Sequence, residues 1–499
     1  MNDEVKEWLK IKEIYLILFL IVISFLVRAL IAPLYIMFPY IPHDFSAYIG
    51  GGKCMAEGKY FMWDCTDWAK RTTSRSLYGP LYLTLSMVWY LIFGIDFFSF
   101  KMLSTVFDVA NVVLIFFIGR KFFNKETSFY LALVYSLSFL PLHTSSVLGN
   151  NNPVFMSFLL LSIYFLMEKK LILSSFFSIA SILFKIIPAM VFPVIIYYIF
   201  RKYGRKKTMM YIFSSILFFI LLIIPFIMIA GLEKTLYSFM ATLSYDYSGS
   251  GTMSIYNIFK YVSNIDIDFL SKGVLIAGYL VTFYLIIKHP LKNFEIELQR
   301  NILLIFICSV LLGIWIAPYY MYFLFLFIFF LFGNNVTKIK RMKKQWLFGV
   351  SLTIISLILF SAIYRWGFVN YTWFDRVLLL VAVVLAPIGT FYSLNWLKKS
   401  YRNVWVLLVF AIIMFEELHA APLVILPMEK LADKLIDTSK MKVVMELYGD
   451  HIDSKSKFLA YGIFYGLPAL MVWVGLIYYY YILLKEKYEN KLFDHLQYR

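Results

Sequence analysis

Apolar runs long enough to cross a lipid bilayer recur along nearly the whole chain, and they limit its fold more than any other feature. The first occupies residues 12–33 and reads KEIYLILFLIVISFLVRALIAP. A helix needs about 20 apolar residues to cross the hydrocarbon core. Hydrophobic residues make up 61% of the 499, more than a soluble fold can bury. We therefore expect an all-α polytopic integral membrane protein, with about 13–14 transmembrane helices judged by run length.

Basic residues gather in short clusters between these runs, and the formal net charge is +17. The clusters include GRKFFNKE at 119–126, RKYGRKK at 201–207 and KIKRMKK at 338–344. Cationic loops stay on the cytoplasmic side, so alternation of the runs predicts cytoplasmic N- and C-termini. No separate basic domain offers a groove to nucleic acid, so we expect no nucleic-acid partner. The outer loops are then 34–79, 143–153, 231–268 and the polar segment 428–457.

Two runs are unusual in length. Residues 80–94 begin at Pro80, end at Gly94 and are short, which predicts a juxtamembrane helix dipping into the membrane from the outer side. The run from 171 to 200 is too long for one crossing and too short for two full ones. Lys185 and Pro188 interrupt it, so we expect two short spans that meet at the outer side near Lys185.

The first outer loop carries the most suggestive titratable residues. His43 and Asp44 precede FSAYIGGGKCMAEG, which predicts a short helix lying on the membrane. A carboxylate held at an interface is partly desolvated, which raises its pKa toward that of a useful general base. Solvation of an ordinary polar loop explains most of the other charges in this loop equally well. Cys54 and Cys65 can pair if the loop faces an oxidising compartment.

Lys185 is exceptional because it lies inside the apolar stretch IASILFKIIPAMVFPVII. A lysine at a helix centre costs about 2.5–3.5 kcal/mol on insertion scales, so it must snorkel, pair or occupy a break. Its ammonium at the outer surface can hold a phosphate or reach lipid headgroups, and both readings stay open.

Other polar features are less specific. LGNNNP at 148–153 is either an ordinary turn or a sugar or headgroup contact, with Asn150 the residue we select, and His143 stands just before it. Glu416 and Glu417 are unexpected so late in an apolar span, and their role stays open. Nucleotide-binding and metalloprotease motifs are absent, and GGGK at 50–53 lacks the P-loop spacing. Any donor substrate must therefore reach the protein through the membrane.

Several of these motifs, in this order, resemble the GT-C glycosyltransferases, polytopic enzymes that take sugars from polyprenyl-phosphate carriers. The first loop has an acidic residue, Asp44, a tyrosine four residues later, and then AEGKY and YGPLYLTLSMVWYLIFG, with Gly79 in place of a family proline. LFKIIPAMVFPVII is similar to the family's Lys-x-x-Pro segment, and SSVLGNNNP to its second outer loop. IAPYYMYFLFLF resembles its Ser-Pro-Gln-Tyr segment, with Tyr319 in place of glutamine. The similarity covers residues 12–335.

The resemblance implies a catalytic membrane module at 1–335, followed by additional helices at 336–499. It implies inverting transfer of a sugar, with mannose expected, from dolichyl or undecaprenyl phosphate to a lipid-linked glycan, glycolipid or protein at the outer face. Asp44 would be the general base, and Lys185 with Arg71 or Arg75 would stabilise the phosphate. The other expected substrate contacts are His43, Tyr78, His143, Asn150, Tyr245, Asp246 and Tyr319. No metal or other cofactor is required, although Asp64 and Asp67 leave a metal-assisted variant open.

Two readings compete with this enzyme. A transporter or lipid flippase would carry ionisable residues near the bilayer midplane on facing helices. The sequence places them mainly at the outer interface, Glu416 and Glu417 excepted, which favours the enzyme. The other competing reading is a non-catalytic assembly partner that keeps the fold. Membrane lipids surround the chain in every case.

Overall fold

The computed structural model describes residues 3–32, 43–58, 78–94, 96–233, 235, 268–313, 318–366, 373–414 and 467–485. The chain divides into two compact units, and each is described by itself. Unit 1 comprises residues 1–245, 293–299 and 328–337, and unit 2 comprises 246–292, 300–327 and 338–499. The expected division into a catalytic module, 1–335, and additional helices, 336–499, is functional and stays a prediction.

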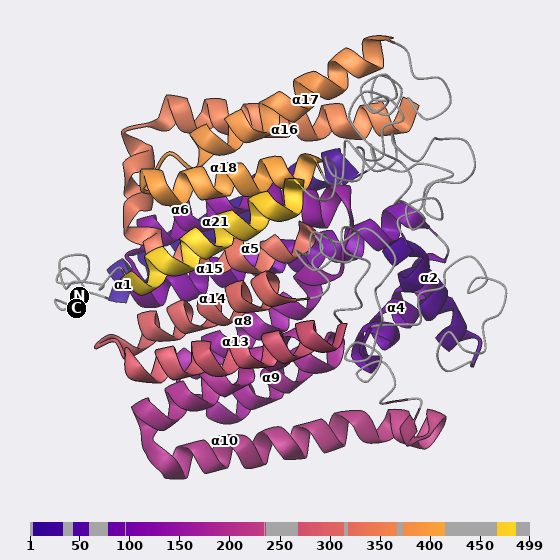
Figure 1. Cartoon of the computed structure of the whole chain (residues 1–499), viewed down its shortest axis with the longest axis vertical. Helices are drawn as coiled ribbons and strands as arrows, with labels where there is room; N and C mark the ends of the chain where they lie inside the picture. Colours follow the sequence, from indigo (N-terminus) through magenta and orange to yellow (C-terminus); the bar gives the residue numbers. More distant parts are fainter. Residues whose placement is uncertain are drawn as a thin grey trace. The chain divides into compact units, whose positions relative to one another are not determined.

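Helices form all the regular structure of the described residues (Figure 1). The elements of unit 1 are α1 (Asp3–Ile31), α2 (His43–Ala56), α4 (Pro80–Phe93), α5 (Phe97–Phe122), α6 (Lys125–Ser136), α7 (Phe139–Leu142), the π-helix η2 (His143–Val147), α8 (Asn152–Met167), α9 (Leu171–Phe184), the 3₁₀ turn η3 (Ile187–Met190) and α10 (Phe192–Ala230).

The elements that lie wholly in unit 2 are α13 (Asp268–Lys288), the 3₁₀ turn η4 (Pro318–Tyr320), α16 (Lys343–Trp366), α17 (Trp373–Ser393), α18 (Lys399–Ile413) and α21 (Leu467–Lys485). Three elements begin in one unit and end in the other: α14 (Phe294–Leu312), α15 (Met321–Phe332) and the 3₁₀ segment η5 (Gly333–Lys340).

Five stretches of the described residues are long and apolar enough to cross a membrane: Glu13–Ile31, Phe98–Phe122, Ile187–Ile229, Lys343–Phe360 and Leu467–Leu484. Shorter apolar helices, among them α4, α8, α9 and α15, accompany them. The expected all-α polytopic membrane fold is therefore confirmed. The number of spans and the orientation of the termini stay predictions.

The longest apolar stretch contains a sharp turn. Gly204, inside the basic cluster RKYGRKK, adopts φ 79° and ψ 176°, so α10 consists of two helices joined at this residue. Positive φ is accessible to glycine because it has no Cβ. The sequence predicted two separate spans on either side of this cluster, and the turn at Gly204 agrees with that division.

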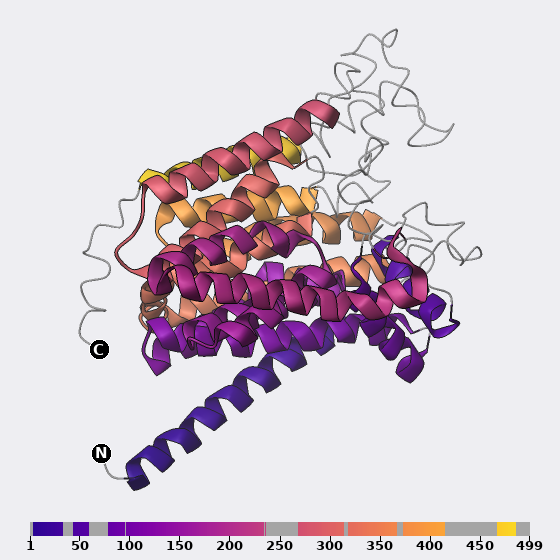
Figure 2. The ribbon, with the colours of Figure 1, turned by 90° about the horizontal axis from the view of Figure 1, so that it is seen from below.

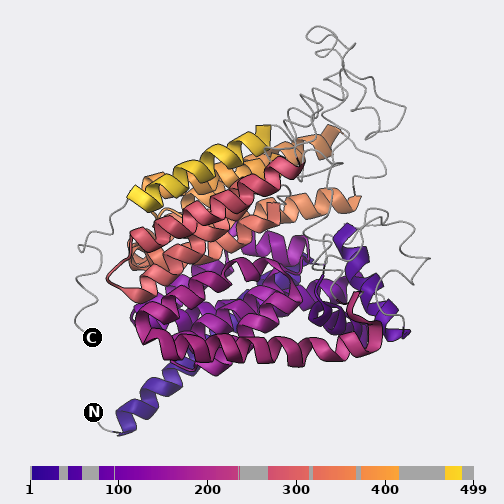
Figure 3. The same ribbon diagram turned by 60° about the horizontal axis from the view of Figure 1, so that its bottom comes forward.

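α9 and α10 meet around a second interruption, as predicted for Lys185 and Pro188. α9 ends at Phe184, Lys185 is extended with φ −156° and ψ 139°, and η3 follows before α10 begins. Ile179 and Leu183 of α9 pack with Ile223 of α10, and the two helices lie side by side (Figure 3).

The lipid-facing character of α1 agrees with its apolar sequence. Tyr15, Leu18 and Leu30 are exposed in the structure, and the N-terminal half of the helix projects away from the other helices of unit 1 (Figure 2). Arg28, near the other end of the same helix, is fully buried.

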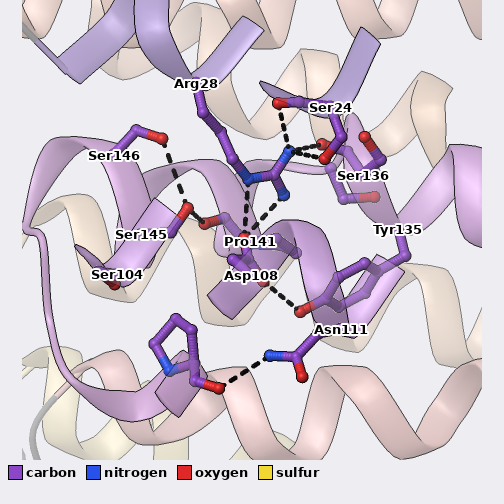
Figure 4. Close-up of polar contacts among 12 residues, drawn as sticks. Ser24, Arg28, Ser104, Asp108, Asn111, Tyr135, Ser136, Pro141, Ser145 and Ser146 are labelled. Carbon is purple, nitrogen blue, oxygen red and sulfur yellow. Dashed lines mark hydrogen bonds and ion pairs between the residues drawn. The ribbon is translucent and has the colours of Figure 1, made fainter. Parts of the chain in front are cut away.

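Arg28 forms a buried ion pair with Asp108 of α5 (Figure 4). Its Nε and Nη2 donate to Asp108 Oδ2 at 2.9 and 2.7 Å, and Tyr135 of α6 donates to Asp108 Oδ1 at 2.8 Å. Arg28 Nη1 donates to Ser24 Oγ and to the Ser136 carbonyl. Arg28 lies near the end of α1 that leads into the first predicted outer loop, and the placement of ionisable residues at the outer interface stays a prediction.

In unit 2, polar and aromatic contacts join neighbouring helices. Ser356 of α16 donates to the Ala382 carbonyl of α17 at 2.8 Å. The rings of Tyr401 on α18 and Tyr479 on α21 meet edge to face, with 5.4 Å between their centroids. This unit contains Tyr319, whose ring lies 5.2 Å from that of Tyr320.

Candidate active site

Lys185 lies at the broken connection between α9 and α10, with only 6% of its surface exposed. Its ammonium donates to the side-chain oxygens of Asn151 at 3.2 Å and Asn152 at 3.1 Å. It also lies 5.9 Å from the ring centre of Tyr78 and 5.6 Å from that of Phe155. Amide dipoles and aromatic faces offset part of the desolvation of a buried cation.

Asn151 and Asn152 belong to the turn LGNNNP at 148–153, called here the asparagine turn. Hydrogen bonds within the turn and to other residues of unit 1 hold it in place. Gly149 adopts φ 60°, and the Asn150 side chain accepts from the Asn152 amide at 3.0 Å. The Asn150 amide donates to the Thr144 carbonyl at 2.9 Å. In addition, Asn111 of α5 donates to the Pro153 carbonyl at 3.0 Å. The turn therefore holds its position through contacts on both sides.

His143 begins the π-helix η2, which ends at Val147, shortly before the asparagines. It is 1% exposed and stacks on Phe139 with 5.2 Å between ring centres and 14° between planes. π-helical segments are rare and occur frequently at functional sites. The structure therefore places His143 in an aromatic stack beside the asparagine turn.

Tyr78 enters the site from the end of the first loop. Its ring packs with those of Tyr48 of α2 and Tyr82 of α4, at 4.9 and 5.4 Å between centroids. Tyr48 and Tyr82 lie 5.1 Å apart, so the three rings form one cluster. The hydroxyl of Tyr48 accepts from the Asn151 amide at 3.3 Å. The tyrosine cluster thus connects α2 and α4 to the turn that holds Lys185.

Gly79 explains the departure from the family's proline at this point. Its N–H donates to the Phe184 carbonyl at 3.1 Å, and a Cβ at this residue would approach the Leu183 carbonyl oxygen to 1.9 Å. Proline has no N–H and would carry that Cβ. Glycine therefore lets the end of the first loop lie directly against the backbone that leads to Lys185.

α2 approaches α4 through its glycines. A Cβ at Gly52 would lie 2.5 Å from the Ser86 carbonyl oxygen, and one at Gly51 would lie 2.7 Å from Leu83 Cδ2. Small residues allow helix backbones to approach closely. This contact, together with Tyr48, fixes the place of α2 within unit 1 (Figure 1).

His43 and Asp44 form the first turn of α2. Asp44 precedes Tyr48 by four residues, the spacing that places two residues on one face of a helix. Since Tyr48 bonds the asparagine turn, this register puts Asp44 one helical turn from a residue in contact with the Lys185 site. The first-loop helix predicted from the sequence is confirmed by α2.

The remaining predicted residues are not brought to this cluster by the described structure. Arg71, Arg75, Tyr245 and Asp246 lie outside the described residues, as do Asp64, Asp67, Cys65, Glu416 and Glu417. Tyr319 belongs to unit 2. Cys54 is disulfide-bonded, whereas Cys308 is a free thiol. Among the described residues, no three His, Cys, Asp or Glu side chains gather into a metal-binding group.

Sequence reasoning missed Tyr48, Asn151 and Asn152 as members of the site. The run of three asparagines was the available signal, and selecting Asn150 alone left out the two residues whose side chains bond Lys185. The buried pair of Arg28 and Asp108 was also missed, although charged residues inside two apolar runs could have indicated it.

Comparison with known proteins identifies the class of enzyme. Residues 77–320 match the model of Glycosyltransferase family 87, a range that includes Tyr78, the asparagine turn and Lys185. No curated protein matches the chain. The match favours the enzyme over the transporter and assembly-partner readings. The predicted resemblance is confirmed: residues 77–320 are similar to glycosyltransferase family 87, a GT-C-type family of membrane glycosyltransferases.

Proposed function

We propose that the protein transfers a sugar, with mannose expected, from dolichyl or undecaprenyl phosphate to a lipid-linked glycan, glycolipid or protein acceptor. The observation that carries this proposal is the buried ammonium of Lys185 at a helix break, bonded to Asn151 and Asn152 and flanked by the rings of Tyr78 and Phe155. A buried cation among donors and aromatic rings suits a lipid-linked phosphate and the sugar attached to it.

The proposed reaction is a single displacement with inversion. Asp44 takes the proton from the acceptor hydroxyl, whose oxygen forms a bond to the anomeric carbon of the sugar. The bond between that carbon and the phosphate oxygen breaks, and its electron pair leaves with polyprenyl phosphate. The phosphate gains one negative charge, which Lys185, with Arg71 or Arg75, stabilises. Because protein cations can neutralise a single phosphate, the step requires no metal.

The other predicted residues have supporting roles in this proposal. Tyr78 and Asn150 line the approach to Lys185, and His143 supports the turn. His43, Tyr245, Asp246 and Tyr319 contact the sugar or lipid.

The proposed site faces the outer side of the cell membrane, with both termini in the cytoplasm. The disulfide at Cys54, in α2, supports this orientation because disulfides persist in oxidising compartments outside the cytoplasm. Protease accessibility of terminal tags in sealed cells tests it. Tags cleaved from the outside would contradict the orientation.

The central experiment measures transfer of radiolabelled mannose from dolichyl or undecaprenyl phosphate by the purified protein, with membrane extract as acceptor. Asp44→Asn should lower the rate about 100- to 10,000-fold, the contribution typical of a general base. Glu57→Gln is the matched control, since Glu57 lies just after α2 and forms a half-exposed ion pair with Lys53. Absence of transfer by wild type from every carrier and sugar tried would overturn the function, and full activity of Asp44→Asn would overturn the base.

A further inference from the structure

The side chain of Asn151 has an unused donor at the centre of the candidate site. Asn151 is 2% exposed, and among the residues that the structure describes its Nδ2 has no hydrogen-bond partner. Its side-chain oxygen accepts from Lys185, and its backbone amide donates to Tyr48. A buried amide donor without a partner loses about 1–3 kcal/mol of hydrogen bonding relative to water. A ligand that accepts a hydrogen bond from it would recover this free energy.

The position of Asn151 adds a second electrostatic feature. Asn151 is the N-cap residue of α8, and its side chain makes no capping hydrogen bond. The N-terminus of a helix carries a partial positive charge and favours anions. Three groups therefore attract an anionic ligand placed beside them: the amide donor, the Lys185 ammonium and this helix end.

The hydrogen-bonding character of the cluster selects among ligand types. The side-chain oxygens of both Asn151 and Asn152 are directed at the ammonium of Lys185. The NH₂ group of Asn151 is therefore left as a hydrogen-bond donor for a ligand. A sugar hydroxyl seeks an acceptor as well as a donor, whereas a phosphate oxygen only accepts. This pattern favours the phosphate.

We propose that Asn151 Nδ2 donates a hydrogen bond to a non-bridging phosphate oxygen of the polyprenyl-phosphate leaving group, beside Lys185. The inference rests on the proposed function and adds a ligand-binding residue to it. As the bond to the sugar breaks, the phosphate gains charge and the hydrogen bond from Asn151 strengthens. Asn151 therefore lowers the barrier as well as holding the ground state.

Two variants test this role. Asn151→Asp keeps the size of the side chain and its bond to Lys185 but replaces the NH₂ donor with an anionic oxygen. It should lower kcat/KM for the donor about 100-fold or more, as loss of a transition-state donor does. It should also raise the inhibition constant of undecaprenyl phosphate while leaving that of unphosphorylated undecaprenol unchanged. Asn151→Ala removes the donor without adding charge and should act in the same direction, which keeps the test decisive if Asn151→Asp does not accumulate.

Asn152→Asp is the matched control because it places the same charge beside the same ammonium. If Asn151→Asp and Asn152→Asp lower activity and undecaprenyl phosphate binding equally, neutralisation of Lys185 explains both and the role of the Asn151 donor is refuted. Activity of Asn151→Ala within about threefold of wild type, small against the effect expected of a lost donor, would refute it as well. If wild type transfers no sugar but binds undecaprenyl phosphate in an Asn151-dependent manner, the proposed function fails and the phosphate site stands.

Discussion

Two of the buried cations of unit 1, Arg28 and Lys185, are held in different ways. Arg28 lies against Asp108, a carboxylate that also accepts from Tyr135, so its charge is compensated in a fixed geometry. Lys185 donates to the side-chain oxygens of Asn151 and Asn152 and lies near the aromatic ring of Phe155. The first arrangement joins helices, whereas under the proposed function the second holds a phosphate. Exchange of partners at the two sites tests this distinction.

The largest effect is expected at Asp108. Asp108→Asn leaves the Arg28 guanidinium buried without its counter-ion and should destabilise the protein by about 3–5 kcal/mol. The measurement is thermal unfolding of the purified protein in detergent. The double variant Arg28→Met with Asp108→Leu removes both charges and should recover most of the loss. A single variant as stable as wild type would show that the pair does not hold α1 to α5.

A comparable change at Lys185 should reduce activity and leave stability intact. Lys185→Met removes the charge at nearly constant length, and loss of its phosphate interaction should lower kcat about 100- to 1,000-fold. The unfolding temperature should stay close to that of wild type, because methionine keeps nearly the length and volume of the lysine side chain. Transfer assays and thermal unfolding of the same preparation provide the comparison. If Lys185→Met instead unfolds, and its activity falls only in proportion to the fraction of protein that unfolds, Lys185 is a structural residue like Arg28.

The contact between α2 and α4 should be of intermediate importance. Gly52→Ala puts a methyl group against the Ser86 carbonyl and forces α2 to shift, at an overpacking cost of about 1–3 kcal/mol. Because α2 carries Asp44 and Tyr48, transfer activity should fall even where the protein remains folded. Gly273→Ala in α13 is the control, since no atom lies within 4 Å of its added Cβ. Equal activity of the two variants would mean that the close contact between α2 and α4 does not determine the geometry of the active site.

The smallest effect is expected for a cation paired at the surface. Lys121 bonds Glu168, and this bond lowers the pKa of the Glu168 carboxyl. A carboxyl whose pKa is lower in the folded state stabilises the fold at neutral pH, and that contribution disappears as the pH falls through the folded-state pKa. Glu168→Gln should lower the free energy of unfolding by about 0.2–1 kcal/mol at pH 7. The variant should also lose the part of the pH dependence of stability that comes from this carboxyl. Unfolding temperatures measured between pH 7 and pH 3 check both points, and a loss as large as that of Asp108→Asn would be inconsistent with surface screening.

Parts of the candidate site could be predicted from local sequence. A lysine followed by Pro188 in an apolar run indicated a break, and the break occurs at Lys185. The turn LGNNNP and the residue Tyr78 were likewise selected, and both contact the Lys185 cluster. The roles of Asp44, Arg71 and Arg75 stay predictions, since they depend on side chains that the described structure does not include.

The sequence by itself determined the membrane fold and its class, because hydropathy and helix length follow directly from residue type and order. It also located the helix break at Lys185 through proline and charge. Only the tertiary structure decided which residues meet across long separations: Arg28 with Asp108, Gly79 with Phe184, Tyr48 with Asn151. Helix packing sets these contacts. The order of residue types along the chain does not by itself reveal which helices lie against each other. For the same reason, the unused donor of Asn151 became visible only when its oxygen was found on Lys185.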